Sequence, residues 1–314
     1  MNFQLKVLLL SFVVSVILGA IIIPILRKLK VGQIERTDGP QSHLKKQGTP
    51  TMGGIIMALT MLLISGFLYW EYMKTEPDVA TRMIPLVFDD FKKLVLKNTE
   101  GLKPAYKMIG LLIIAVAYTL YLVKYLNIGT ETYIPILKEY ITLPIWLYIP
   151  FAIFVLLGTT NAVNLTDGID GLSTSVTTII LTCLVSISII LGIKEVTLAG
   201  TILIGACLGF LIFNLHPAKV FMGDTGSLAL GGAIAGIALY LKMPLLLIII
   251  ALVPIIETVS VMMQVAYYKK TGKRIFKMAP IHHHFELCGW KEGKVVSVFS
   301  IITLILCIIG ISVI

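Results

Sequence analysis

The chain has 314 residues, of which 57% are hydrophobic and 14% are charged, and its mean hydropathy is +0.93. Soluble domains are about 45–50% apolar and about 25% charged, so this composition excludes a water-soluble globular protein and indicates a polytopic helical membrane protein. The formal net charge of +9 does not indicate nucleic-acid binding, because most basic residues lie between apolar runs, where membrane topology places them.

Nine apolar runs are long enough, or nearly so, to cross about 30 Å of hydrocarbon, which takes roughly 20 residues. They lie at about 3–26, 51–71, 105–126, 144–163, 171–192, 196–213, 226–241, 244–267 and 295–314. The first is too long for a signal peptide and is predicted to remain as a membrane helix. A tenth candidate, 79–88, is short and contains Arg82. We therefore expect one integral membrane domain over residues 1–314 and no soluble domain.

The distribution of positive charge indicates that the tenth candidate also crosses. Loops 27–50, 89–107 and 268–294 hold six, five and seven of the 26 basic residues, which predicts that all three are cytoplasmic. The first two share a side only if the chain crosses twice between them. The sequence therefore predicts an all-α fold of about ten membrane helices, with both termini outside and the active site in cytoplasmic loops. The outer loop 127–143 is expected to form a short hairpin or an interfacial segment.

Two adjacent acids, Asp89 and Asp90, follow the short third span. They could end a hydrated helix with Lys92 and Lys93 as partners. Neighbouring acids beside lysines also suit metal–phosphate chemistry.

A polar stretch at 161–171 interrupts two apolar runs, where unsatisfied polar groups are costly unless they line a site. Asn164, Asp167 and Asp170 recur every three residues, so one helical turn would place them on one face. The alternative, a segment that caps the next helix, would need only one aspartate.

A second polar loop, 214–225, leads to Asp224 between two glycines. Asp224 or Ser227 could simply cap the next helix. A helix start is also an anion site, and Mg²⁺ is bound by one or two carboxylates together with phosphate oxygens. We therefore interpret Asp224 as a candidate Mg²⁺ ligand.

Three consecutive histidines, residues 282–284, lie in the last basic loop. Zinc is one alternative, but consecutive histidines on a regular element cannot all reach one ion. Histidine near phosphates fits better. With the lysines and threonines of 42–54, the inside loops favour phosphoryl transfer to a lipid, assisted by a divalent metal.

Five segments carry a family resemblance: 42–54, 89–102, 161–172, 213–232 and 279–290. Together they resemble the phospho-N-acetylmuramoyl-pentapeptide transferases, within the polyprenyl-phosphate N-acetylhexosamine-1-phosphate transferase superfamily. The resemblance implies transfer of phospho-MurNAc-pentapeptide from UDP-MurNAc-pentapeptide to undecaprenyl phosphate, giving lipid I and UMP. It also implies Mg²⁺ as cofactor, a homodimer, and an active site on the cytoplasmic face of the bacterial cell membrane.

The resemblance also assigns roles to residues of this chain. The catalytic candidates are Asp89 (as base or nucleophile), Asp90, Asp224 and His283, and the Mg²⁺ ligands would be Asp224 and, as a second candidate, Asp167. The substrate-binding candidates are Lys46, Thr51, Lys93, Lys107, Asn164, Asp167, Asp170, Asn214, Phe221, Gln264, His282 and His284. Two departures from the family pattern are the short third span and Val298, where the family often has arginine.

Two other functions stay open at this point. One is a related transferase that uses a UDP-N-acetylhexosamine donor. The other is a lipid transporter or flippase, which would need acids scattered along the spans. Only Glu257 looks clearly intramembrane, whereas the other acids discussed above gather on one predicted side.

Overall fold

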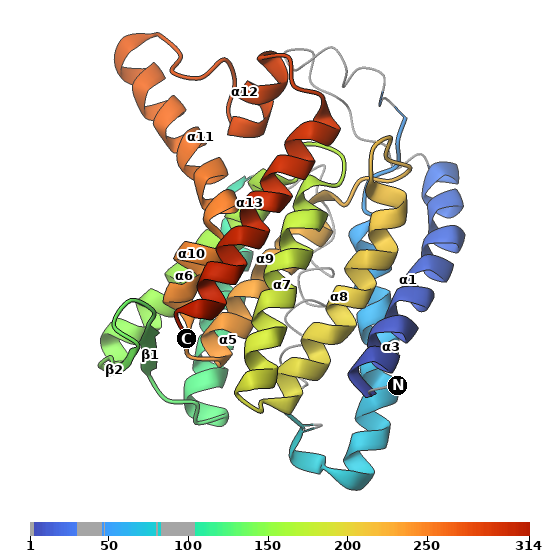
Figure 1. Ribbon diagram of the computed structural model, residues 1–314, viewed down its shortest axis with the longest axis vertical. Helices are drawn as coiled ribbons and strands as arrows, with labels where there is room; N and C mark the ends of the chain where they lie inside the picture. Colours follow the sequence, from blue (N-terminus) through green and yellow to red (C-terminus); the bar gives the residue numbers. More distant parts are fainter. Residues whose placement is uncertain (1–2, 30–45, 47, 80, 83–103) are drawn as a thin grey trace.

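The computed structural model describes residues 3–29, 46, 48–79, 81–82 and 104–314, and over these residues the fold is helical apart from one hairpin, as predicted (Figure 1). The helices are α1 (Phe3–Lys28), α3 (Gly54–Thr75), α5 (Pro104–Leu120), α6 (Ile145–Thr166), α7 (Leu172–Ile190), α8 (Lys194–Asn214), α9 (Gly223–Tyr240), α10 (Leu247–Ile250), α11 (Leu252–Thr271), α12 (Ile281–Leu287) and α13 (Glu292–Ser312). Two short turns, the π-helical η1 (Tyr121–Tyr125) and the 3-10 η2 (Pro244–Leu246), extend α5 and precede α10.

Within the described residues, seven helices are long and apolar enough to cross a membrane, or eight if one bent pair counts as a span. The predicted third span, 79–88, falls largely outside the described residues. The count of ten therefore stays a prediction, while the multi-pass helical class is confirmed.

The predicted span 244–267 is not one straight helix. The segments Pro244–Ile250 and α11 meet at an angle of 81°. Pro254 lies in the first turn of α11 and has no N–H to donate to the carbonyl of Ile250, so one helical hydrogen bond is missing at the bend. As a result α11 leans out of the bundle, and α12 folds back against it (Figure 1).

The predicted hairpin is present as β1 (Glu131–Ile134) and β2 (Glu139–Thr142), an antiparallel pair. It lies at the opposite end of the bundle from α12 (Figure 1). Tyr133 Oη donates to the carbonyl of Val313 at 2.8 Å, and Lys242 Nζ lies 2.6 Å from Glu131 Oε2. These contacts join the hairpin to the end of α13 and to the segment after α9.

Helix α9 runs through the centre of the bundle, and every residue from Thr225 to Tyr240 is buried. Its glycines and alanines leave room for close neighbours. Gly226 on α9 and Gly54 on α3 approach so closely that a Cβ on Gly54 would overlap the backbone of Gly226. This crossing holds α3 against the start of α9.

Gly54→Ala is therefore expected to destabilise the protein. Overpacking typically costs about 1–3 kcal/mol, and here the obstacle is backbone, which cannot rotate away. Thermal unfolding in detergent measures the loss. Gly66→Ala on the same helix is the matched control, because a Cβ there would meet no described atom within 4 Å. Equal melting temperatures for the two variants would contradict the close crossing.

Candidate active site

Two connections meet at the end of the bundle that carries α12: the α6–α7 turn and the α8–α9 loop. Helix α6 ends at Thr166, and Asp167 is its C-terminal cap. Gly171, with φ +76°, takes a left-handed conformation that glycine tolerates best and precedes α7. The prediction that one helical turn carries the polar residues 164–170 is therefore wrong, because the helix stops midway through them.

Asp224 lies in the first turn of α9, ahead of the apolar stretch, and collects two hydrogen bonds. Lys107 Nζ donates to its Oδ2 at 2.7 Å, and Asn164 Nδ2 donates to its Oδ1 at 2.9 Å. Asn164 Nδ2 also lies 2.8 Å from Ser227 Oγ. Burial raises the pKa of the Asp224 carboxyl, but the hydrogen bonds from Lys107 and Asn164 outweigh it and hold that pKa below its ordinary value. The Asp224 carboxyl is therefore more acidic than an ordinary aspartate.

Asp167 lies beside Asp224, and its pKa is shifted in the opposite direction. Burial, followed by the negative charge of Asp224, raises the pKa of Asp167 to about 7, although a hydrogen bond from the backbone N–H of Gly223 lowers it. Two neighbouring carboxylates that repel each other, with an amide beside them, form an oxygen-rich set that a hard divalent cation would satisfy. We call Lys107, Asn164, Asp167, Asp224 and Ser227 the Asp224 cluster; its donor chemistry fits Mg²⁺.

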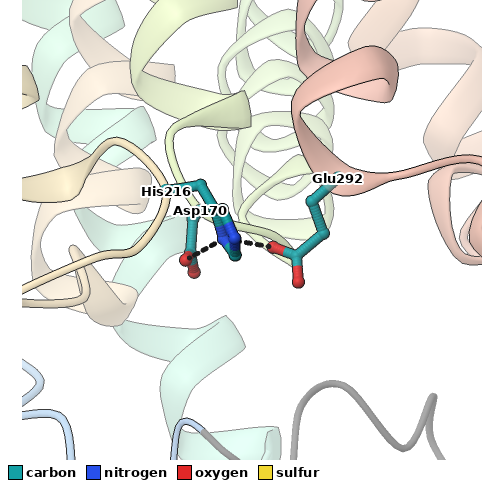
Figure 2. A group of neighbouring side chains, drawn as sticks. All are labelled: Asp170, His216 and Glu292. Carbon is teal, nitrogen blue, oxygen red and sulfur yellow. Dashed lines mark hydrogen bonds and ion pairs between the residues drawn. The ribbon is translucent and has the colours of Figure 1, made fainter.

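A second cluster gathers Lys46, Asp170, His216 and Glu292. Figure 2 shows the His216 ring between the two carboxylates, with Nδ1 3.0 Å from Asp170 Oδ2 and 3.6 Å from Glu292 Oε2. One ligand atom from each of these three residues lies within 4.8 Å of the others, a spacing that could hold a metal. However, Lys46 Nζ already lies 2.8 Å from Asp170 Oδ1 and 2.6 Å from Glu292 Oε2. The ammonium group supplies the positive charge that a metal would bring.

Removing that charge is expected to destabilise the fold. Asp170 and Glu292 are almost fully buried, with side chains 2% and 6% exposed, so Lys46→Met would leave two buried carboxylates without the ammonium charge that balances them. Breaking a buried pair costs about 3–5 kcal/mol. Thermal unfolding in detergent measures this loss. Lys194→Met is the control, because its pair with Glu76 is exposed and little change is expected; an equally small effect of Lys46→Met would argue against the cluster.

The three consecutive histidines contact three different partners. His282 Nδ1 lies 3.0 Å from Glu257 Oε2, and His283 Nδ1 lies 2.8 Å from Glu286 Oε2. His284 Nδ1 accepts a hydrogen bond from the backbone N–H of residue 277 at 3.1 Å. The Nδ1 atom of each ring thus contacts a different group, and within the described residues no candidate metal site includes these three histidines.

Several predicted site residues hold the loops in place. Asn214 is buried: its Oδ1 accepts from Thr174 Oγ1 at 2.7 Å, and its Nδ2 donates to the carbonyl of Val220 at 3.1 Å. Gln264 Nε2 donates to the carbonyl of Phe276 at 3.1 Å, and its Oε1 accepts two backbone N–H groups at 3.0 Å. Their amides are therefore engaged with the protein.

The remaining predicted residues divide between the described and undescribed parts of the chain. Thr51 lies against Gly223, where its Oγ1 would be 2.8 Å from an added Cβ. The backbone N–H of Phe221 donates to the carbonyl of residue 50 at 2.8 Å, so this loop is tied to the segment before α3. Asp89, Asp90 and Lys93 lie outside the described residues.

Sequence reasoning did not select four residues that the site uses. Ser227 was interpreted only as a possible cap and Glu257 only as an intramembrane acid, and His216 and Glu292 were not selected as site residues. His216 sits in the polar loop before Asp224, which is a usable signal. Glu292 begins α13 and resembles an ordinary acid at a helix start, so no local pattern marks it.

Comparison with known proteins shows that this chain is similar to members of one sequence family. The sequence model described as "Glycosyl transferase family 4" matches residues 83–242. A protein of Clostridium botulinum (strain Eklund 17B / Type B) is 52% identical, over 98% of this chain and 95% of its own length. Proteins of Clostridium perfringens (strain 13 / Type A) and Acetivibrio thermocellus are 53% and 46% identical, over 96% and 97% of this chain and 95% and 93% of their own lengths. All three are named phospho-N-acetylmuramoyl-pentapeptide-transferase.

Proposed function

Because the chain belongs to the phospho-N-acetylmuramoyl-pentapeptide-transferase family and is a membrane-embedded transferase, we propose that the Asp224 cluster is its active site. The reaction moves phospho-MurNAc-pentapeptide from UDP-MurNAc-pentapeptide to undecaprenyl phosphate, giving lipid I and UMP. The observation that carries the assignment is the pairing of two adjacent carboxylates with Lys107 at one end of the helix bundle. Polyanionic substrates need positive charge beside their phosphates, which a carboxylate-bound metal ion and a lysine can supply together.

The metal is proposed to be Mg²⁺, held by Asp224 with Asp167 as a second ligand. When bound, it supplies positive charge that neutralises the diphosphate and stabilises the leaving UMP. Lys107, which donates to Asp224 at 2.7 Å, is proposed to bring a further positive charge to a phosphate oxygen. Asn164 orients the Asp224 carboxylate through its hydrogen bond at 2.9 Å.

The remaining residues are proposed to bind or activate the substrates. Asp89, with Asp90 beside it, is proposed as the base that deprotonates the lipid phosphate, because the predicted span 79–88 would end next to it, at the depth of a lipid headgroup. Phe221 is proposed to stack on the uracil ring. His283 is proposed as a phosphate-side catalytic residue, with Glu286 2.8 Å from its Nδ1. A homodimer stays a prediction, which mass measurement in detergent would test.

Measuring UMP release tests the function. Purified protein should release UMP from UDP-MurNAc-pentapeptide only when undecaprenyl phosphate and Mg²⁺ are both present. A stoichiometric burst of UMP without lipid would show a covalent intermediate and remove Asp89 from the role of base. Faster turnover of a UDP-N-acetylhexosamine would favour the related transferase, and no turnover of either donor would favour a transporter.

The membrane is proposed to be the bacterial cell membrane, with the Asp224 cluster on the cytoplasmic face. In a variant without its native cysteines, Thr271→Cys should react only with a membrane-permeant thiol reagent in intact cells. Thr130→Cys, four residues before the end of β1, should react with an impermeant one. Labelling of position 271 from outside would mean that 79–88 does not cross.

A further inference from the structure

Glu257 and His282 form a pair that the proposed mechanism does not yet use. Both side chains are fully buried, at 0% exposure, although Glu257 lies on α11 and His282 on α12. Glu257 Oε2 lies 3.0 Å from His282 Nδ1, and the backbone N–H of His282 also points to this oxygen at 3.4 Å. One carboxylate oxygen therefore holds both the ring and the main chain of His282.

The far side of the imidazole has no hydrogen-bond partner within the part of the chain that the structure describes. Among the described residues, His282 Nε2 is buried and makes no hydrogen bond. Leaving a buried polar atom unpaired costs about 1–3 kcal/mol, so such an atom calls for an explanation such as a ligand that completes it. Nε2 lies against Gly168, where an added Cβ would overlap the ring. Gly168 follows Asp167, so the free nitrogen is directed at the backbone beside the Asp224 cluster.

We propose that Glu257 is a positioning residue for the transfer reaction, which fixes the tautomer and orientation of His282 so that Nε2 faces the phosphate-binding side of the Asp224 cluster. This inference rests on the proposed function. By accepting the Nδ1 proton, the carboxylate leaves Nε2 as the ring nitrogen that lacks a partner among the described residues. When Nε2 also carries a proton, the Glu257 charge balances the imidazolium, and the Nε2–H can donate to a phosphate oxygen.

The position of Glu257 supports this role. Burying an ionisable residue on an apolar helix costs free energy, so such a residue is expected where it has a partner and a functional role. The bend before α11 turns this helix towards α12, so the carboxylate reaches the histidine from behind, on the side away from Gly168. The absence of a side chain at Gly168 provides the space for the ring.

A double-mutant cycle separates positioning from a purely structural role. Glu257→Gln keeps the shape but removes the charge, and we expect kcat for UMP release to fall by about 10–100-fold, as for other partners that orient a histidine. In a His282→Ala background, the same change should cost no more than about twofold, because there is no ring left to position. Multiplicative losses in the double variant would overturn the inference, and so would full activity of Glu257→Gln.

Two further variants keep the test decisive if Glu257→Gln folds poorly. Gly168→Ala should displace the same ring from its other side and lower kcat, and it should lose this effect in the His282→Ala background. Equal losses from Gly168→Ala in both backgrounds would contradict the proposal. Glu195→Gln is the matched control, because it removes another buried carboxylate, bonded to Tyr240 Oη at 2.5 Å, near the opposite end of α8 from Asn214. Its turnover should match that of wild type.

The activity of the wild-type protein shows whether a negative result concerns the proposed function or only the role of Glu257. If wild-type protein does not release UMP from the donor, both the proposed function and this inference fail. If wild type is active and the cycle is multiplicative, only the role of Glu257 fails.

Discussion

Asp224→Asn is expected to lower turnover by at least about 10³-fold, which corresponds to about 4 kcal/mol of lost transition-state stabilisation. Asparagine has nearly the same shape and can still interact with Asn164, so the fold should persist. It lacks the negative charge that would hold the metal and that pairs with Lys107 at 2.7 Å. UMP release, measured over a Mg²⁺ titration, gives the effect on both kcat and apparent metal affinity.

The control for this experiment is Glu131→Gln. Glu131 is an exposed carboxylate that also pairs with a lysine, at 2.6 Å, but on the hairpin at the other end of the bundle. It should leave turnover and its Mg²⁺ dependence unchanged. Near-normal activity of Asp224→Asn at saturating Mg²⁺ would remove Asp224 from the role of metal ligand.

Asp167→Asn is expected to stabilise the metal-free protein at alkaline pH while abolishing most of its activity. Because the folded-state pKa of Asp167 is raised to about 7, the folded protein holds this proton more tightly than the unfolded chain does. Stability therefore falls as pH rises from about 4 to about 7, and above that range the ionised, half-buried carboxylate costs on the order of 4 kcal/mol. Asparagine mimics the neutral acid and avoids this cost.

The measurement compares thermal unfolding of wild type and Asp167→Asn in detergent at pH 5.5 and pH 8.5, with and without Mg²⁺. Without metal, the variant should melt higher than wild type at both pH values, and by more at pH 8.5 than at pH 5.5. Added Mg²⁺ should raise the melting temperature of wild type more than that of the variant, because the metal would balance the negative charge of Asp167, which asparagine lacks. A variant that is less stable than wild type at pH 8.5 without metal would contradict the assignment.

Local patterns in the sequence determined much of the fold. The apolar runs at about 3–26 and 196–213 coincide with α1 and α8 to within two residues at each end, because burial in lipid demands continuous apolar sequence. The hairpin in 127–143 was also predicted. The start of α9 at Gly223 places Asp224 at a helix N-terminus, as the glycines on either side of it indicated.

The sequence alone also indicated which loops hold the candidate site, because carboxylates and amides between apolar runs are costly unless they line a site. The family resemblance was confirmed by relatives about 50% identical over nearly the whole chain. The roles assigned to individual residues remain proposals.

Only the tertiary structure decided which of these groups act together. Lys46 meets Asp170 across 124 positions and Glu292 across 246, and no periodicity connects residues so far apart. Glu257 reaches His282 because α11 bends by 81° and α12 folds back on it. The sequence pattern shows which side of a helix is apolar and where a loop begins. The partner of each buried charge depends instead on how distant helices pack. Leaving such a charge unpaired would cost several kcal/mol.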